Sequence, residues 1–269
     1  MRAQAMAANP APPRTRRLRI VLMDSSAATD ASVRRACPPL ITIDGPGGVG
    51  KSAIAAELAR RLGWVSLDTG AIYRTAALEA LRQGADLDDG ARLAEIAASV
   101  AARYCAASGE SGTKALLDGE DVSDALRGAA ISQATPRVAR WPEVREPLIA
   151  LQRRLAAERP TVAEGRDMGA VVFPAAPLKF YLTASTAERV ARRAAQLGDR
   201  GSGEPGDLAA RIAERDRMDR GRSVGALRAP AGAVVFDTTG RDMENELSLM
   251  AAMARAIWWS QNRAIANDA

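Results

Sequence analysis

The residues of this chain best suited to chemistry form a glycine-rich segment, GPGGVGKS, at residues 45–52. It matches the pattern G-x-x-x-x-G-K-[ST] at every fixed position. Glycines let the backbone turn its N–H groups around a phosphate, and the start of a following helix adds partial positive charge. Lys51 is placed to reach the β- and γ-phosphates of a nucleotide, and Ser52 to offer its hydroxyl to Mg²⁺. The predicted nucleotide-binding residues are therefore Gly45, Gly47, Gly48, Val49, Gly50, Lys51 and Ser52.

Two carboxylates are candidates to hold Mg²⁺ through water near this loop. Asp44 and Glu164 each stand at the end of an expected strand. An ordinary role in a turn is an equally good interpretation of either residue.

Arginines after two other expected strands point to a second, anionic ligand. DTGAIYR at 68–74 and EGRDMG at 164–169 would meet at the carboxyl edge of a parallel sheet, beside the loop. Arg74 and Arg166 could then face one site. Two helical faces farther along are also rich in arginine, with Arg189, Arg192 and Arg193 on one, and Arg211, Arg215, Asp219 and Arg222 on the other. Such stripes are usually solvated surface, but here they bracket a glycine-rich stretch in a nucleotide-binding protein, which favours an anionic acceptor.

Composition excludes several classes of site. The chain has 269 residues, a net charge of +5 and no histidine, so histidine triads, histidine metal sites and a histidine base are excluded. Its two cysteines, Cys37 and Cys105, form no pair motif, so we expect a reducing, cytoplasmic location. No apolar run approaches the roughly 18 residues of a membrane span, so we expect no membrane partner. The basic stripes lack interleaved aromatic residues, which disfavours a nucleic-acid partner.

The elements that must position these residues alternate between strands and helices. Short apolar runs predict five strands, at Leu40–Asp44, Trp64–Leu67, Thr161–Ala163, Leu178–Leu182 and Ala233–Phe236. A helix is expected over Lys51–Leu62, ended by Gly63. The alternation predicts an α/β fold with a parallel sheet covered on both faces.

Residues 40–269 are predicted to form a single domain. Its core is assigned to 40–74, 150–191 and 223–269. An acceptor-binding insert is expected at 75–149, with a hairpin pairing Val100–Cys105 and Lys114–Leu117, and a mobile lid at 192–222. Residues 1–39, rich in arginine and alanine, are expected to form a disordered extension, while a transit peptide and a start codon placed too early remain open as alternatives. The apolar run before Trp258 predicts a final amphipathic helix packed on the core.

Among proteins with this loop, the chain resembles bacterial cytidylate kinase, a nucleoside monophosphate kinase. IDGP at 43–46, DTGAIYR at 68–74, LDGEDVS at 117–123, EGRDMG at 164–169 and the pattern Arg215-Asp216…Asp219…Arg222 together carry the resemblance, which covers about 40–262. It implies a P-loop NTPase fold with a five-stranded parallel sheet, a nucleotide-binding insert and a short lid. It also implies a monomeric enzyme that uses ATP with Mg²⁺ to phosphorylate CMP and dCMP.

The resemblance also implies roles for matching positions. Arg74, Arg166, Arg215 and Arg222 would hold the acceptor phosphate and the transferring group, and Asp219 the acceptor ribose. Arg145 and Asp167 would contact the cytosine edge, while Thr69 and Tyr73 would line the acceptor pocket. The catalytic residues would be Lys51, Arg166, Arg215 and Arg222.

The chain departs from the family pattern at two places. Pro136 stands where the family usually has a cytosine-contacting serine, and the neighbouring Thr135 could substitute for it. Gly225-Ala226-Leu227 stands where Ala-Pro-Leu is usual. The first departure bears on base selectivity and the second on loop stiffness.

Two alternatives to this function remain open. A P-loop kinase for a hydroxyl acceptor would need a base, for which Asp68 or Asp167 could serve, although the arginines fit a phosphorylated acceptor better. A regulatory nucleotide-binding module would bind ATP without acceptor-dependent turnover. A GTPase is disfavoured because none of the four asparagines precedes a lysine, as its base-reading motif would require.

Overall fold

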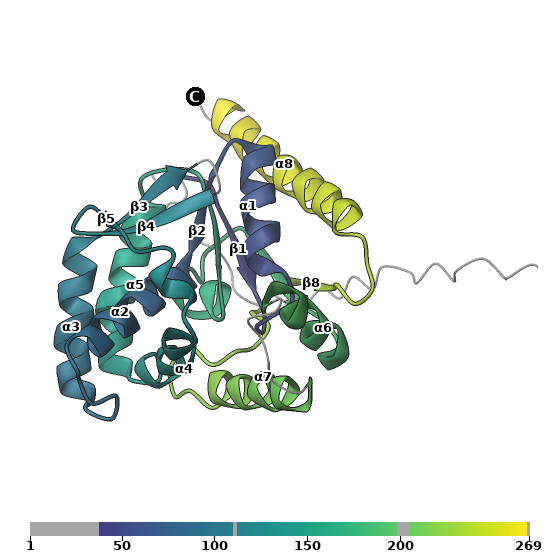
Figure 1. Cartoon of the computed structure of the whole chain (residues 1–269). Coiled ribbons are helices and arrows are strands. Elements are labelled where there is room, and N and C mark those ends of the chain that lie inside the picture. Colours follow the sequence, from purple (N-terminus) through teal and green to yellow (C-terminus); the bar gives the residue numbers. More distant parts are fainter. Residues whose placement is uncertain (1–37, 110–111, 198–204, 268–269) are drawn as a thin grey trace, which may run out of the picture.

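The central feature is a sheet of five parallel strands in the order β2-β6-β1-β7-β8 (Figure 1). The computed structural model describes residues 38–109, 112–197 and 205–267. The strands are β1 Leu40–Asp44, β2 Val65–Asp68, β6 Thr161–Gly165, β7 Leu178–Thr183 and β8 Val234–Asp237. The predicted parallel α/β sheet is thus confirmed, with strand bounds shifted by one or two residues at several ends. The strands are largely apolar because helices cover both faces of the sheet.

Helices α1 (Lys51–Leu62) and α8 (Met243–Asn267) pack on one face of the sheet. Their apolar residues form one core cluster with the strand residues Ile41, Ile43, Phe180 and Phe236. The α1 bounds match the prediction, and Gly63 ends the helix in the left-handed conformation with φ 69°. The predicted final helix is confirmed as α8, which buries Leu247, Met250 and Ala254 against the core.

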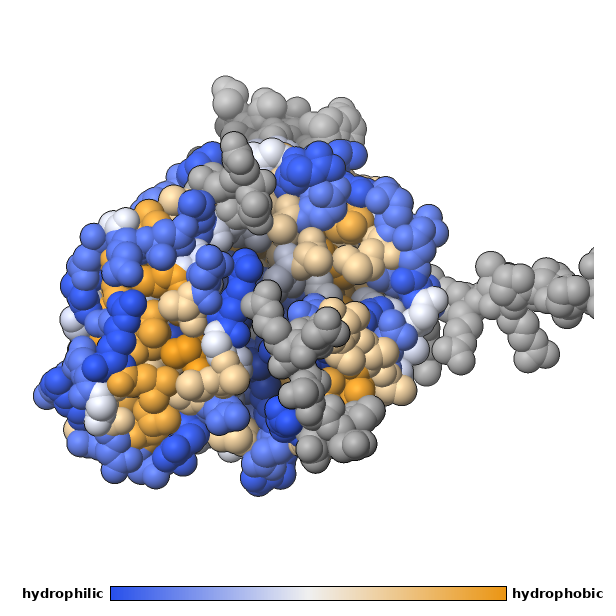
Figure 2. Space-filling view, in the orientation of Figure 1, coloured by the Kyte–Doolittle hydropathy of each residue, from blue (hydrophilic) through white to orange (hydrophobic). Residues whose placement is uncertain are grey.

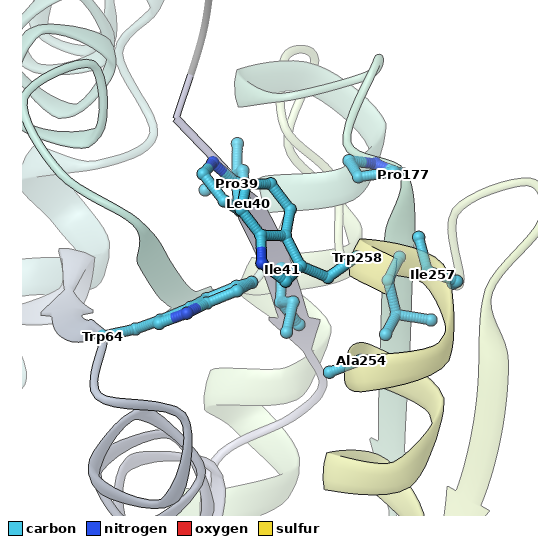
Figure 3. A pocket seen from close by; sticks show the side chains of 9 residues that line it. Pro39, Leu40, Ile41, Trp64, Pro177, Ala254, Ile257 and Trp258 are labelled. Atoms are coloured by element: carbon cyan, nitrogen blue, oxygen red, sulfur yellow. The ribbon is translucent and has the colours of Figure 1, made fainter. Parts of the chain in front are cut away.

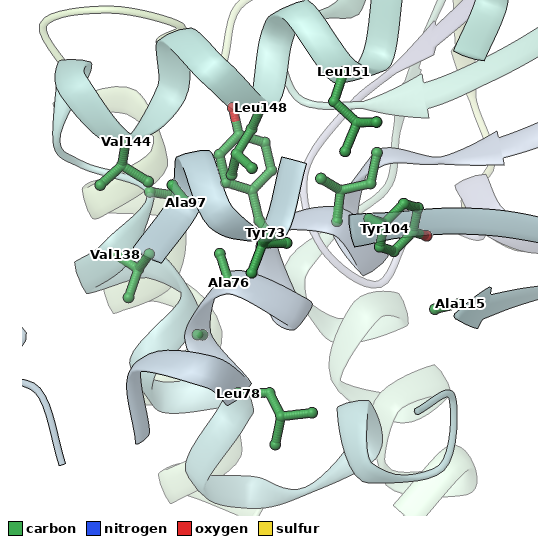
Figure 4. Packing of buried hydrophobic residues seen from close by; sticks show 14 of the residues in the cluster. Tyr73, Ala76, Leu78, Ala97, Tyr104, Ala115, Val138, Val144, Leu148 and Leu151 are labelled. Carbon is green, nitrogen blue, oxygen red and sulfur yellow. The ribbon is translucent and has the colours of Figure 1, made fainter. Parts of the chain in front are cut away.

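The opposite face is covered by α2 (Thr69–Arg82) and α5 (Pro142–Ala156), with α3 (Gly90–Arg103) outside them. Figure 4 shows Tyr73 from α2 lying beneath α5 beside Leu148, within a second apolar cluster. Between β6 and β7 a π-helical turn, η3, spans Met168–Val172. The two clusters bury both faces of the sheet, which leaves its carboxyl edge available for a site.

The segment between α3 and α5 forms a small antiparallel sheet and a helical pair. Its elements are β3 Tyr104–Gly109, β4 Gly112–Leu117, β5 Glu120–Asp121, the 3-10 turn η2 Ala125–Arg127 and α4 Ala129–Val138. The predicted hairpin began too early, because Val100 to Arg103 form the last turn of α3. The buried residues Leu93, Ile96, Ala97 and Val100 follow helical spacing, and this packing decides the boundary.

Helices α6 (Thr186–Leu197) and α7 (Pro205–Arg220) pack together beside the amino end of α1 (Figure 1). Most of the segment predicted as a lid, 192–222, is therefore helix, and 198–204 lie outside the described residues. Arg222 lies two residues beyond the end of α7. It therefore does not share a helix face with Arg215 and Asp219, contrary to the prediction.

The predictions for 1–37 concern residues outside those described. Among the described residues, no helix combines the length and the apolar character needed to span a bilayer.

Candidate active site

The segment Gly45–Gly50 connects β1 directly to α1, at the place where β1 lies between β6 and β7. Glycine is required at Gly45, where φ is 151° and a Cβ would stand 2.3 Å from the carbonyl oxygen of Leu182. Gly48 and Gly50 also have positive φ, at 80° and 92°. The Lys51 side chain is buried and its Nζ donates to the carbonyl oxygen of Pro46, at 2.8 Å. This geometry is that of a phosphate-binding loop at a sheet's topological switch point.

Of the two carboxylates considered for Mg²⁺, only Glu164 lies beside the Ser52 hydroxyl. Ser52 Oγ donates to Glu164 Oε1 at 2.6 Å. The Asp44 carboxylate is turned away and accepts the backbone N–H groups of Met168 and Gly169, at 2.7 and 2.8 Å. Burial raises the pKa of Asp44 to about 7. Asp44 therefore anchors the turn that follows β6, while Ser52 and Glu164 form a pair of oxygens of the kind that Mg²⁺ prefers.

Lys51, which is buried, lies beside the loop with the half-buried Arg166 and Arg215. A Cβ on Gly47 would lie 3.5 Å from Nη2 of Arg166. Burial, followed by repulsion from Arg166 and Arg215, lowers the pKa of Lys51 to about 7 although Glu164 opposes the shift. Burial and the Arg166 guanidinium also lower the pKa of Arg215 to about 10, and Arg74 contributes in the same direction. Within the described part of the chain, the buried Nε of Arg215 has no hydrogen-bond partner. The site thus concentrates positive charge, which an anion would stabilise.

Asp219 of α7 ties two of the predicted arginines together. Its Oδ2 accepts from Arg166 Nε at 2.8 Å, and its Oδ1 accepts from Arg222 Nη2. Although burial raises the pKa of Asp219, Arg166 and Arg222 bring it below its ordinary value. Arg74, by contrast, donates to Asp68 Oδ2 at 2.7 Å, at the start of its own helix. Arginines from α2, from α7 and from the segments that follow β6 and α7 therefore lie in one region of the molecule.

A second polar group, Arg145 and Asp167, lies near enough to Arg222 to interact with it electrostatically. Arg145 of α5 donates to Asp167 Oδ2 at 2.5 Å, and only 1% of Arg145 is exposed. The guanidinium carbon of Arg145 lies 5.3 Å from the centre of the Tyr73 ring. A Cβ on Gly225 would come within 2.2 Å of Arg145 Nη2 and 2.3 Å of Asp167 Oδ2. A buried, paired donor and acceptor of this kind can contact the edge of a nucleobase.

Two threonines considered for the acceptor pocket already make internal hydrogen bonds. Thr69 Oγ1 donates to the carbonyl oxygen of Glu164 at 2.7 Å, which fixes the start of α2 against β6. Thr135 Oγ1 donates to the carbonyl oxygen of Ile131 at 2.6 Å, within α4. Thr135 can therefore accept a further hydrogen bond but has no free proton to replace that of a serine at position 136.

The structure adds two residues to which the sequence analysis gave no role, although Asp216 stands in the family pattern. Asp216 pairs with Arg189, and Thr238 accepts a hydrogen bond from Arg192. Asp216 and Thr238 are both buried. A pair between two helices has no local sequence signature, since its members are far apart in the chain. The stripe of Arg189, Arg192 and Arg193 was the available signal for one half of these contacts.

The polar hollow and the apolar pocket lie in different places. In Figure 2, blue residues line the hollow between the α2–α5 side of the molecule and the α1–α6 side. Figure 3 shows an apolar pocket at the amino end of β1, where Pro39, Leu40, Trp64 and Trp258 meet. The Trp64 and Trp258 rings pack edge to face with centres 6.4 Å apart. With no charged residue in its lining, that pocket does not suit a nucleotide phosphate.

A phosphate-binding loop facing arginines on separate segments is the arrangement that phosphoryl transfer requires, because two anions must be brought together. Fold and site thus define a P-loop phosphotransferase. The family model described as cytidylate kinase matches residues 41–255. The chain belongs to the cytidylate kinase family.

Individual relatives agree with this assignment. A cytidylate kinase of Shewanella loihica is 47% identical over 78% of this chain and 92% of its own length. One from Shewanella halifaxensis is 44% identical over the same shares. One from Pseudomonas aeruginosa is 42% identical over 77% of this chain and 90% of its own length. The chain therefore spans nearly the whole of these relatives.

Proposed function

We propose that this protein transfers the γ-phosphoryl group of ATP to CMP and dCMP, giving ADP and CDP or dCDP. The observation that carries the proposal is the gathering of Lys51, Arg166 and Arg215 beside the loop, where burial, and then repulsion from the two arginines, lowers the pKa of Lys51 to about 7. Mutual repulsion of this kind is relieved when phosphates bind between the cations.

The proposed reaction needs no general base. A phosphate oxygen of CMP attacks the γ-phosphorus, a new P–O bond forms, and the bond to the bridging oxygen breaks to release ADP. A phosphate monoester has a second pKa near 6, so the attacking group is largely a dianion at neutral pH. The protein's work is to position two anions and to stabilise the transferring group, which planar guanidinium groups do well.

Each group of side chains has a proposed role. Lys51 and the loop amides hold the ATP phosphates. Arg74, Arg166, Arg215 and Arg222 bind the acceptor phosphate and the transferring group, while Asp219 binds the acceptor ribose. Arg166, held by Asp219 at 2.8 Å, connects the two halves of the site.

The residues present suit Mg²⁺, which ATP-dependent phosphoryl transfer generally uses. Ser52 and Glu164 would hold it, since their hard oxygen atoms lie 2.6 Å apart at the loop. When bound, the ion neutralises charge on the β- and γ-phosphates.

Base selectivity is assigned to Arg145 and Asp167. The amino group of cytosine can donate a hydrogen bond to Asp167, and its acceptor atoms can receive one from Arg145. Uracil has a carbonyl oxygen in place of the amino group, so it offers the Asp167 carboxylate no donor. Pro136 supplies no donor, and the Thr135 proton is used within α4. We therefore expect ATP turnover to be faster with CMP than with UMP, and we expect the difference to come from this one buried pair.

The test is release of ADP, coupled to a spectroscopic assay, with CMP, dCMP, UMP, AMP and GMP as acceptors. We expect CMP and dCMP to accelerate ATP turnover most. If no acceptor accelerates it, the kinase proposal fails and a regulatory nucleotide-binding module becomes the better interpretation. If UMP or AMP clearly exceeds CMP, the proposed base contacts are wrong although the family stands.

A further inference from the structure

We propose that Arg189 is a positioning residue that couples helix α7 to the phosphate-binding loop, so that acceptor binding and ATP binding strengthen each other. The inference rests on the proposed function, because it takes the acceptor to bind the arginines on and after α7.

One buried guanidinium bridges the loop and α7. Arg189 Nε donates to the carbonyl oxygen of Gly47 at 2.6 Å. Its Nη1 and Nη2 donate to the two carboxylate oxygens of Asp216, at 2.5 and 2.8 Å. Arg189 and Asp216 are each only 5% exposed. The planar fork thereby fixes the distance between a loop peptide and a residue near the C-terminal end of α7.

These contacts control the direction of the loop amides. In a trans peptide, the carbonyl of one residue and the N–H of the next point in opposite directions. Holding the Gly47 oxygen toward α6 therefore aims the Gly48 N–H away from α6. Arg192 directs the Gly50 N–H in the same way, since its Nη1 donates to the Val49 carbonyl oxygen at 3.3 Å. Arg192 is anchored on Thr238, to whose carbonyl oxygen its Nη2 donates at 2.6 Å. Of these two arginines, Arg189 is the one bonded to α7.

The other end of the bridge lies among the proposed acceptor groups. Asp216 directly follows Arg215 and lies one turn before Asp219, which holds Arg166 and Arg222. Any shift of α7 that moves Arg215 and Asp219 must carry Asp216 with them. It must then either pull on the Gly47 peptide through Arg189 or break a buried ion pair. An acceptor that fixes α7 should therefore also fix the loop for ATP.

The test measures how CMP changes the dissociation constant of a non-hydrolysable ATP analogue with Mg²⁺, by calorimetry on the full chain. Couplings between sites commonly amount to roughly 5- to 150-fold, and we expect a value in this range for the unmodified protein. Asp216→Asn keeps the shape of the side chain but removes the charge that holds Arg189. We expect it to bring the coupling to about twofold or less, with a smaller effect on analogue binding in the absence of CMP.

The matched control is Glu214→Gln on the same helix. It removes one negative charge from a side chain that is 53% exposed and paired with Arg217 in α7 itself. This variant should keep the full coupling. Arg189→Lys is a second test, since lysine retains the charge but lacks the fork needed to bond Gly47 and Asp216 together; it should lose the coupling as Asp216→Asn does. Thermal melting confirms that each variant is folded.

The outcomes separate this proposal from the proposed function. CMP binding to the unmodified protein, measured alone, reports the function. If CMP binds but leaves analogue affinity unchanged, the coupling proposal fails and the function stands. The proposal is also overturned if Asp216→Asn and Arg189→Lys keep the coupling, or if they weaken analogue binding equally with and without CMP. If CMP does not bind at all, both proposals fail.

Discussion

How strongly a single arginine of this site acts on a bound phosphate depends on how much of its charge is neutralised by neighbouring carboxylates. Arg166 and Arg222 share the carboxylate of Asp219, so two guanidinium groups meet one anion. Charge left over in a buried site acts strongly on a bound phosphate, because water screens it little.

We predict that Arg166→Ala and Arg222→Ala each lower kcat/KM for CMP phosphorylation by about 10³-fold or more, the scale of a stabilising arginine in phosphoryl transfer. Steady-state kinetics with ATP and CMP measures this. Arg127→Ala is the control, since the Arg127 side chain is 82% exposed and should change kcat/KM little. Equal, small effects in all three variants would mean that these arginines do not contact the reacting groups.

Lys51 should take up a proton when ATP binds. Because the pKa of Lys51 is lowered to about 7, its side chain is neutral in most of the ligand-free protein near pH 8. A bound triphosphate favours the charged form. Affinity for ATP should therefore fall as pH rises above about 7, by up to tenfold per unit. Calorimetry at pH 8 in buffers of different ionisation enthalpy counts the protons. Lys51→Met should remove this uptake, and Lys114→Met, 52% exposed, should keep it.

The same shift has a consequence for stability. Because the folded pKa lies below the ordinary value of 10.5, the folded chain binds fewer protons than the unfolded chain between pH 7 and 10.5. The contribution of Lys51 to the free energy of unfolding therefore rises with pH in this window. Urea unfolding of the ligand-free protein should show that this rise is smaller in Lys51→Met.

Among the contacts between elements, the approach of the segment after α7 to the Arg145–Asp167 pair leaves the least room for a side chain. Gly225 has φ +73°, and a Cβ there would stand 2.2 Å from Arg145 Nη2. Glycine allows the chain after α7 to lie directly on the pair, so this segment closes the proposed base site.

Gly225→Ala should raise KM for CMP on the order of tenfold, equivalent to about 1.4 kcal/mol, because the methyl group must displace Arg145 or Asp167. Gly84→Ala is matched, since Gly84 has φ +61° and no atom lies within 4 Å of its Cβ position. Both variants should lose roughly 1–2 kcal/mol of stability through the left-handed conformation. Kinetics and thermal melting distinguish the two effects; an unchanged KM in Gly225→Ala would show that this segment does not touch the base site.

At the level of the whole molecule, the proposed site combines residues from nearly the full length of the described chain. The loop lies between β1 and α1, Arg145 comes from α5, Arg166 follows β6, and Asp219 belongs to α7. A ligand that contacts all these segments should stabilise them as one unit.

We predict that CMP at about 100 times its dissociation constant raises the free energy of unfolding by about 2.7 kcal/mol, in a single transition. Urea denaturation followed by circular dichroism and tryptophan fluorescence measures it. In Arg145→Met, the same CMP concentration should raise the free energy of unfolding much less, measured against the ligand-free form of that variant. Two separate transitions, of which CMP shifts only one, would instead show that the insert and the core unfold independently.

Much of the fold was predictable because its signals are local. A glycine pattern fixes the loop, since few other residues adopt positive φ, and short apolar runs mark strands buried on both faces. Alternation of strand and helix then implies a parallel sheet whose carboxyl edge gathers the loop, Glu164 and Arg166. The sequence by itself therefore determined the class of protein and the region of its site.

Tertiary structure decided which of several equivalent side chains does what. Asp44 and Glu164 were equal candidates until the first was found to accept two backbone N–H groups and the second to contact Ser52. Arg222 fell outside its expected helix, and Asp216 was found paired with Arg189 across two helices. Hydrogen bonds and ion pairs act over a few ångströms, so residues far apart in the chain acquire partners only when packing sets the distance between their helices.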